Sequence, residues 1–328
     1  MYTVINPEIV DKLYNHKAIK NVKKKVTLTG FVPEGLEGIR VPDYESRNID
    51  VGYRARKVPY WLGSFAQEKW IIAERFKKEA QKYNLSCDID TNEHKRLYGK
   101  KWYNFIASCK AMLGTESGAS IIDYSGLLQQ KIEKLQLHNP DLEYNQIKDE
   151  YFSTDGDIII HVISPRCFEA ASLKTLMVLY PGTYSGILEP WKHYLPLKRD
   201  HSNVDEVIAV IKNPDKASEI IDNAYEDIAT NSKYSYRSMV SDLDKEILIL
   251  IKHKLTKNIY KNNHKNTYFW PLFYEKICRF HFIFLSKPIS LAKKMSYRVF
   301  FLLTSTFMSD ASQEKLVRRL KLCFLKIK

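Results

Sequence analysis

Short apolar runs alternate with longer amphipathic stretches over residues 48–180. The first run, NIDVGY at 48–53, is brief, and the later runs are likewise bounded by polar or turn residues, as in strands that are covered on both faces. Between the first two runs, Phe65, Ile72 and Phe76 recur on one side of a helical wheel with charged residues opposite. The pattern predicts strands at 48–53, 85–89, 110–114, 158–163 and 176–180, and helices at 65–83 and 92–108.

This alternation is typical of a parallel sheet with helices on both faces, so we expect a doubly wound α/β fold. The polar stretch 126–156 interrupts it and is either a helical insertion over the sheet or a solvated surface excursion. Further along, Asn203 three residues before Glu206 predicts a helix start of the capping-box type. Asn213 before Pro214 predicts another helix start.

Charge is spread unevenly along the chain. The formal net charge is +13, yet residues 245–328 alone hold 18 Lys and Arg against 4 Asp and Glu, a net of +14, which leaves −1 for the preceding 244 residues. The basic character therefore belongs to the C-terminal part rather than to the predicted sheet. The five cysteines form no C-x-x-C pair and the first residues contain no apolar signal segment, so we expect a cytoplasmic protein.

Three segments follow predicted strands at the edge of the sheet where parallel sheets bind ligands. Helix N-termini at that edge offer free N–H groups and a partial positive charge to phosphate. Each of the three segments can be interpreted either as a ligand-binding loop or as an ordinary turn or surface loop. None of them has the sequence of a Walker loop or a G-x-G-x-x-G fingerprint. The three are Gly52–Arg56 with Arg54 and Arg56, Gly114–Ser120 with Glu116, Ser117 and Gly118, and Ser164–Ala171 with Arg166 and Glu169.

Taken in order, these segments resemble a known family. Arg166-Cys-Phe-Glu-Ala-Ala171, a strand and then Gly182-Thr-Tyr-Ser-Gly186 resemble the donor-binding domain of GT-B glycosyltransferases, and most of all the spore-maturation-type glycosyltransferase-like group. The resemblance covers about residues 47–243. It divides the chain into 1–47, a remnant or linker of an N-terminal domain, 48–244, the donor nucleotide-sugar-binding domain, and 245–328, a basic, aromatic, helical tail.

The resemblance implies transfer of a sugar from a nucleotide-diphosphate donor to a glycan or lipid-linked acceptor, without a metal or other cofactor. By position, Glu169 matches the glutamate that contacts the donor sugar, and Arg166, Arg54 and Arg56 match diphosphate contacts. Tyr184 and Ser185 would lie near the nucleoside or the sugar. In a site of this kind, helix dipoles and basic side chains stabilise the departing diphosphate.

Two departures from the family pattern affect these expectations. Met177 occupies the position of a second glutamate that usually contacts the ribose. At most about 50 residues precede the resemblance, too few for the first of two domains, so a truncated chain or a separate N-terminal acceptor domain is expected. A non-catalytic nucleotide-sugar-binding or scaffold protein is therefore the alternative function. We interpret His161 as a core residue and His193 as part of a packed loop, and no catalytic base is nominated.

The tail mixes its basic residues with Tyr, Phe and Trp. Its apolar run between Arg298 and Asp310 has 11 residues, short of the ~20 that span a bilayer. The composition favours peripheral binding to an anionic membrane surface at the inner face. Packing on the sheet domain is the alternative. Nucleic-acid binding has no RRM or KH signature in its support.

Overall fold

The computed structural model describes residues 1–259, with side chains as far as Ile251. The chain forms two compact units, Met1–Ile247 and Leu248–Lys328. The expectations for the tail from residue 260 onward lie outside the described residues.

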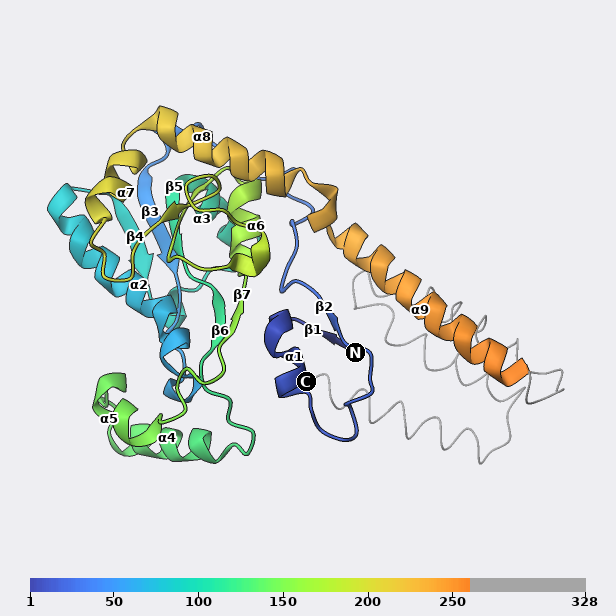
Figure 1. Cartoon of the computed structure of the whole chain (residues 1–328). Coiled ribbons are helices and arrows are strands. Elements are labelled where there is room, and N and C mark those ends of the chain that lie inside the picture. The colour runs from blue at the N-terminus through green and yellow to red at the C-terminus, as the bar shows by residue number, and fades with distance from the viewer. Residues whose placement is uncertain (260–328) are drawn as a thin grey trace, which may run out of the picture. The chain divides into compact units, whose positions relative to one another are not determined.

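A five-stranded, all-parallel sheet forms the centre of the first unit (Figure 1). Its spatial order is β4-β3-β5-β8-β9. The first of these strands in the chain, β3, therefore lies between the second and the third, and the direction of winding reverses between β3 and β5. The strands are β3 (Ile49–Arg54), β4 (Cys87–Asp90), β5 (Cys109–Gly114), β8 (Leu176–Leu179) and β9 (Leu195–Pro196).

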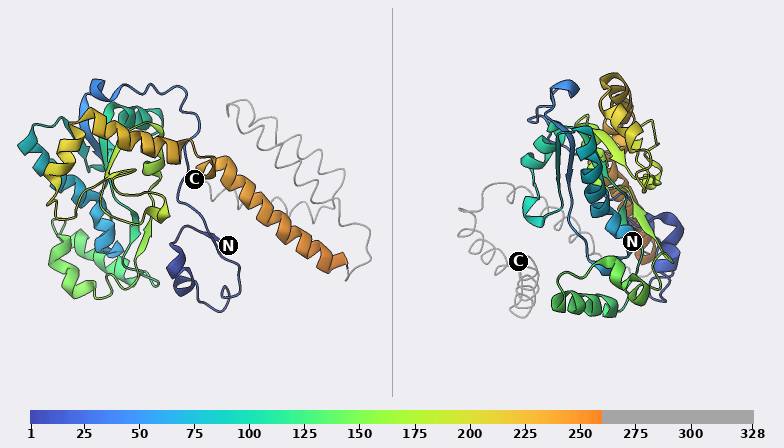
Figure 2. Two further views of the ribbon diagram at one scale, coloured as in Figure 1. Left: turned by 45° about the horizontal axis from the view of Figure 1, so that its top comes forward. Right: turned by 90° about the vertical axis from the view of Figure 1, so that its left-hand side faces the viewer.

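Helices cover both faces of the sheet, as the alternating pattern predicts (Figures 1 and 2). On one face α2 (Ser64–Ala80) and α7 (Val204–Ile211) bury Ile72, Phe76 and Val207 against Val51 and Leu113. The other face is covered by α3 (Lys100–Ser108) and α6 (Pro165–Ser172). The next helix, α8 (Pro214–Ala224), contributes residues to the cores on both faces. The doubly wound α/β fold is confirmed.

The strand predicted at 158–163 is partly wrong. Only Ile160–Val162 form a strand, β7, and it pairs antiparallel with β6 (Ser117–Ala119) in a two-stranded ribbon outside the main sheet. Gly118 allows the two backbones to come this close, because a Cβ there would lie 1.7 Å from the carbonyl oxygen of Ile160. An apolar run alone does not reveal which sheet a strand joins.

Residues 126–156 form a helical insertion with a core of its own. The helices are α4 (Leu127–His138) and α5 (Tyr144–Tyr151), and between them they bury Ile132 and Ile147. Asp155 joins the insertion to the sheet domain, because its carboxylate accepts hydrogen bonds from the Ser64 amide at 3.1 Å and from the hydroxyls of Ser120 and Tyr144. It thereby caps the first turn of α2 from a distant part of the chain.

Two sequence predictions about helix starts have opposite outcomes. Asn213 accepts a hydrogen bond from the Lys216 amide and caps α8, as predicted. Asn203 does not cap α7; its side chain bonds Lys198 N and Pro196 O instead and holds the preceding loop. The helix predicted at 92–108 begins only at Lys100, because Gly99, with φ +54°, breaks the pattern.

The remaining elements are short, apart from α9. The N-terminal segment contains β1 (Tyr2–Thr3) and β2 (Lys25–Val26), which pair in parallel, and α1 (Val10–Leu13). A helix of 24 residues, α9 (Tyr236–Ile259), follows the sheet domain. Single turns of tight helix are η1 (Pro7–Ile9), η2 (Tyr44–Ser46), η3 (Tyr60–Leu62), η4 (Gln81–Tyr83), η5 (Glu93–Lys95), η6 (Tyr184–Gly186) and η8 (Ser232–Tyr234), and η7 (Tyr225–Ala229) is a π-helical turn.

Replacing Asp155 by Asn is expected to lower the free energy of unfolding at pH 7 by about 1–2 kcal/mol, because the carboxylate that accepts these hydrogen bonds is lost. Burial alone would raise the pKa of Asp155, but hydrogen bonds from Ser120, Ser64 and Tyr144 outweigh it and hold the pKa below its ordinary value. The carboxylate therefore stabilises the fold above the unfolded-state pKa of about 3.9, and this contribution is lost as pH falls through the folded-state pKa.

Urea unfolding of both proteins at pH 7 and at about pH 3 measures the effect, and the difference between them should shrink at the acidic pH. Asp157→Asn is the matched control, since Asp157 is exposed and its side chain makes no hydrogen bond among the described residues. An equal loss of stability in the control would contradict the role given to Asp155.

Candidate functional site

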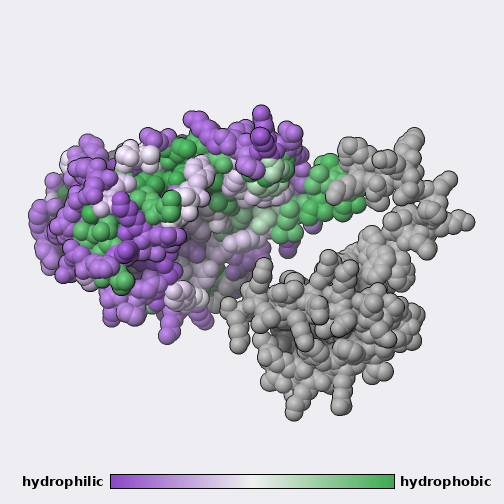
Figure 3. Space-filling model, turned by 90° about the horizontal axis from the view of Figure 1, so that it is seen from below, coloured by the Kyte–Doolittle hydropathy of each residue, from purple (hydrophilic) through white to green (hydrophobic). Residues whose placement is uncertain are grey.

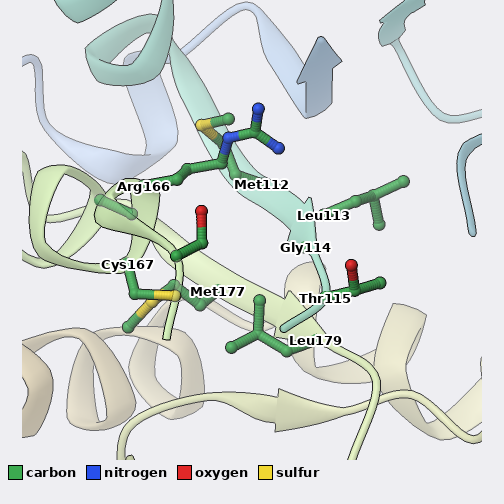
Figure 4. Close-up of a pocket in the computed structure, with 10 residues that line it drawn as sticks. Met112, Leu113, Gly114, Thr115, Arg166, Cys167, Met177 and Leu179 are labelled. Carbon is green, nitrogen blue, oxygen red and sulfur yellow. The ribbon is translucent and has the colours of Figure 1, made fainter. Parts of the chain in front are cut away.

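The carboxyl ends of β3 and β5 form the edge where a doubly wound sheet binds ligands, because the chain reverses its winding there and leaves a crevice. At this edge lies a hollow of about 270 Å³, part of it open to solvent. The room inside it for water is about 10 Å³, enough for about one molecule. Its lining comes from β5, β8 and the start of α6: Met112, Leu113, Gly114, Thr115, Ser164, Arg166, Cys167, Ala170, Met177 and Leu179 (Figure 4).

Arg166 is the cation of this hollow, and it lies across the gap between β3 and α6. Its Nη2 donates to the carbonyl oxygen of Arg54, the last residue of β3, at 2.7 Å. The guanidinium lies 4.7 Å from the ring centroid of Tyr53 and 5.2 Å from that of Trp102. Its Nε is buried and has no hydrogen-bond partner among the described residues. A fixed cation with an unused donor favours an anionic ligand.

Lys69 and Arg56 belong to the same cationic cluster. Lys69 lies on α2, and its pKa is lowered, first by burial and then by the positive charges of Arg166 and Arg56. Arg56 lies just beyond β3 and is exposed. Within residues 1–251, no carboxylate forms an ion pair with any of the three side chains. The cluster therefore carries uncompensated positive charge.

The start of α6 adds its partial charge to the cluster. Ser164 is the N-cap residue, its side chain makes no cap hydrogen bond, and Pro165 is the first residue of the helix. The N-terminal segment holds this turn in place: Thr29 donates to Ile163 O, and a Cβ on Gly30 would lie 2.7 Å from the Pro165 ring. The positive end of the helix therefore points toward the hollow beside Arg166.

Arg54 and Gly52 have structural roles that the sequence did not indicate. The Arg54 guanidinium donates to the Asp88 carboxylate and carbonyl, both at 2.8 Å, and to Lys95 O, and lies 4.3 Å from the ring centroid of Phe105. Gly52 allows the side chain of Cys109 to pack closely against β3, because a Cβ at this position would clash with Cys109 Sγ. The glycine therefore serves packing within the protein rather than the approach of a ligand. The diphosphate role of Arg54 stays a prediction, but its hydrogen-bond donors are already engaged.

Glu116 anchors the loop that follows β8. Its carboxylate accepts from the Tyr184 amide at 2.6 Å and from Thr183 Oγ1 at 3.0 Å. This holds Tyr184 and Ser185 in the left-handed region, at φ +46° and +55°, where residues other than glycine are strained. Gly182 passes so close that a Cβ would lie 2.4 Å from a Glu116 oxygen. Glu116 is thus a buried partner of this turn.

The other predicted donor contacts are divided between core and surface. Tyr184 is fully buried, and its hydroxyl donates to Tyr180 O, so its ring is part of the core. Ser185 is exposed, and its hydroxyl accepts from the Ile163 amide. Ser117 and Gly118 belong to the β6–β7 ribbon. The donor-binding roles of these four residues stay predictions.

Glu169 lies in the second turn of α6, because the helix begins four residues earlier at Pro165. Its Oε2 accepts a hydrogen bond from Trp102 Nε1 at 2.8 Å. Since Trp102 also packs on Arg166, the carboxylate is connected to the cationic cluster through one indole ring. The second carboxylate oxygen makes no hydrogen bond among the described residues.

The interpretation of His161 as a core residue is wrong. It lies in the ribbon with about a fifth of its side chain exposed, and its ring nitrogens lie 3.0 Å from Thr183 Oγ1 and 3.1 Å from a Glu8 carboxylate oxygen. His193 is buried in its loop, as expected, with Nε2 3.0 Å from Asp227 Oδ2. Within residues 1–251, no three His, Cys, Asp or Glu side chains are grouped as metal ligands.

Sequence reasoning missed Lys69, and it included Thr115 and Ser164 in the selected segments without naming either as a contact. Lys69 is one of several lysines on an amphipathic helix, so nothing in the pattern distinguishes it. Thr115 and Ser164 each follow a predicted strand directly, at positions where the sheet edge predicts ligand contacts. That signal was present for both residues.

No protein-family model matches the chain, and no curated protein matches its sequence significantly. Among solved structures, TarM, a GT-B glycosyltransferase, superimposes with a TM-score of 0.37 at 15% identity over 74% of this chain and 42% of TarM. A point mutant of S. aureus TarM in complex with fondaparinux, α-GlcNAc-glycerol and UDP superimposes with a TM-score of 0.36 at 16% identity over 74% and 43%. The chain spans less than half the length of these structures.

Replacing Lys69 by Met is expected to raise the free energy of unfolding at pH 7 by about 0.5–1 kcal/mol, because it removes like-charge repulsion and the cost of a buried ammonium. The folded-state pKa of Lys69 lies below the unfolded value of about 10.4. The charged form therefore destabilises the fold at neutral pH, and that cost is lost as pH rises from the folded-state pKa to the unfolded value.

The measurement is urea unfolding at low salt and at about 1 M salt, where the gain should shrink because the Debye length falls to about 3 Å. Lys78→Met, on an exposed position of the same helix, serves as the control and should change stability little. A gain that is the same in both salts would argue against charge repulsion as its cause.

Proposed function

We propose that the chain is a GT-B glycosyltransferase that transfers a sugar from a nucleotide-diphosphate donor to a cell-surface glycan or a lipid-linked acceptor. The observation that carries this proposal is the uncompensated cluster of Arg56, Lys69 and Arg166 at the switch point of the sheet, beside the start of α6. A diphosphate carries enough negative charge to match such a cluster, and its oxygens can accept the unused proton of Arg166 Nε.

The same cations suit the chemistry of sugar transfer. When the bond between the sugar and the diphosphate breaks, negative charge builds up on the departing nucleoside diphosphate. Arg166 is already held by Arg54 O and two aromatic rings, so its charge needs little rearrangement to stabilise that leaving group. Because side chains and a helix dipole supply this stabilisation, the proposed reaction needs no metal ion.

Glu169 is proposed to contact the donor sugar. One of its oxygens is bonded to Trp102, and the other is left to accept a hydrogen bond from a sugar hydroxyl. Its indirect contact with Arg166, through Trp102, supports a sugar contact beside the proposed diphosphate contact. Arg56, exposed and on the same edge, is proposed as a second diphosphate contact.

Donor binding must open the site. The hollow has room for about one water, far less than a nucleotide needs. Lys69 and Arg56 form no ion pair among the described residues and are not fully buried, so their movement is the simplest way to admit a diphosphate while Arg166 keeps its place. The acceptor and the catalytic base are proposed to come from a second domain, on this chain or on another.

A non-catalytic nucleotide-sugar-binding protein is the alternative function. It is favoured by the extent to which Arg54, Glu116 and Tyr184 are engaged within the protein, which leaves few polar groups free for catalysis. Release of free sugar from a nucleotide sugar by the purified chain would support an enzyme. Binding without turnover, also in the presence of glycan acceptors, would favour the alternative.

Arg166→Met is expected to weaken the binding of nucleoside diphosphates about 10- to 100-fold, because one charge-assisted contact of this kind is worth about 1.5–3 kcal/mol. Isothermal titration calorimetry with UDP, GDP, CDP and dTDP measures this. Arg237→Met is the matched control, since Arg237 is exposed and forms no ion pair among the described residues. If well-folded protein gives no heat with any of these nucleotides or their sugar conjugates, the proposed function is wrong.

Glu169→Ala is expected to weaken the binding of the sugar-bearing donor more than that of the free nucleotide, because its proposed contact is with the sugar. The melting temperature of wild type and variant, with each ligand at about 100 times its Kd for wild type, reports the difference, since such a ligand adds about 2.7 kcal/mol of stability to wild type and less to a variant that binds it more weakly. Equal weakening of both ligands would remove the role given to Glu169.

A further inference from the structure

The helix α9, which contributes no residue to the proposed donor site, contains a band of exposed apolar residues. The five consecutive residues Ile247–Ile251 are each between 43% and 58% exposed. Five residues cover more than one helical turn, so the helix is apolar on every side at this level. Figure 3 shows apolar residues on this part of α9. Helices that are apolar all round belong in an apolar environment rather than in water.

The band coincides with a step in the charge of the chain. Residues 1–246 carry a net charge of −1, whereas residues 247–328 carry 17 Lys and Arg against 3 Asp and Glu, a net of +14. Just before the band, Glu246 is paired with Lys23 at 2.8 Å and with Lys25 at 3.5 Å, so its negative charge is compensated within the first unit. Residues 247–274 contain five lysines and no acidic residue.

We propose that the Ile247–Ile251 band inserts into the interface of an anionic lipid membrane, with the lysines that follow it at the level of the headgroups. Apolar residues next to a basic segment are a combination that binds anionic bilayers. The apolar side chains are buried in the membrane interface, and the basic side chains are attracted to the anionic headgroups. The aromatic residues Tyr268, Phe269 and Trp270 in the same basic segment are of the types enriched at membrane interfaces.

The proposed binding is peripheral. The band has five residues, against the ~20 that span a bilayer. No helix within residues 1–259 has the length and apolar character to cross a membrane. The band and the donor site are separate features of the chain, so this inference does not depend on the proposed function.

The test is co-sedimentation of the full chain with vesicles of phosphatidylcholine alone and of phosphatidylcholine with phosphatidylglycerol. Wild type is expected to bind the anionic vesicles, to bind the neutral ones at least about tenfold more weakly, and to be released by salt. Leu248→Glu combined with Leu250→Glu should weaken binding to the anionic vesicles at least about tenfold, because two charges replace inserted apolar side chains.

The matched control is Leu127→Glu combined with Leu137→Glu, which alters two leucines of α4 that are 67% and 80% exposed. It changes the net charge of the protein by the same amount and should bind vesicles like wild type. Thermal unfolding of all three proteins shows whether they are folded.

Three results would overturn the proposal. Unchanged vesicle binding by the α9 variant would place the membrane contact elsewhere. Equal binding of wild type to neutral vesicles would remove the role of charge. Failure of wild type to bind any vesicle would exclude a membrane as the occupant of the band. In that case, a lower melting temperature of the α9 variant would indicate a segment of the same chain as the occupant, and a change in oligomeric state would indicate a second copy. Calorimetry of nucleotide binding by the α9 variant should match wild type, which separates this test from that of the donor site.

Discussion

The bond from Arg166 Nη2 to the Arg54 carbonyl oxygen determines how the candidate site is built. It joins the end of β3 to the beginning of α6, two segments 112 positions apart in the sequence, at the point where the sheet reverses its winding. Close packing lies beneath it, because Gly52 of β3 leaves room for the side chain of Cys109 on the neighbouring β5. Tyr53 and Trp102 then fix the plane of the guanidinium. A cation held in this way is oriented before any ligand arrives.

Most polar groups around this edge of the sheet have partners inside the protein. Arg54 is paired with Asp88, Arg199 with Glu68, and Glu116 with the turn at Thr183 and Tyr184. These contacts leave Arg56, Lys69 and Arg166 as a group of cations that form no ion pair among the described residues. In the absence of an anion, repulsion within the cluster lowers the stability of the fold. Binding sites that are formed before the ligand arrives commonly have this effect on protein stability.

The sequence was sufficient for the fold class. Buried strands in a parallel sheet are apolar on both faces, so β3, β5 and β8 are recognisable as short apolar runs, and the helix over 64–80 is recognisable by its period. Around the candidate site, Thr115 directly follows β5, whereas Ser164 and Arg166 follow β7 of the ribbon, a strand that the sequence placed in the main sheet.

The contacts between residues that are far apart in the chain could not be predicted from the sequence. Arg54 and Arg166 have similar surroundings in the sequence, yet Asp88 engages the first and leaves the second available. Lys69 joins the cluster only because α2 packs over β3, and the ribbon of β6 and β7 forms only because two segments that flank the insertion meet. Each of these facts depends on tertiary contacts that local pattern does not encode.

The start of α2 also has a consequence for the order in which the molecule assembles. The backbone amide of Ser64 finds its acceptor in a residue 91 positions later in the chain, after both helices of the insertion. Closing a loop of that length costs entropy before any contact compensates it, so this junction belongs to the late, slow part of folding. A proteolytic cut between α4 and α5 would remove the covalent connection, and the two fragments would then be joined by the pairing of β5 with β8 and of β6 with β7, together with this carboxylate.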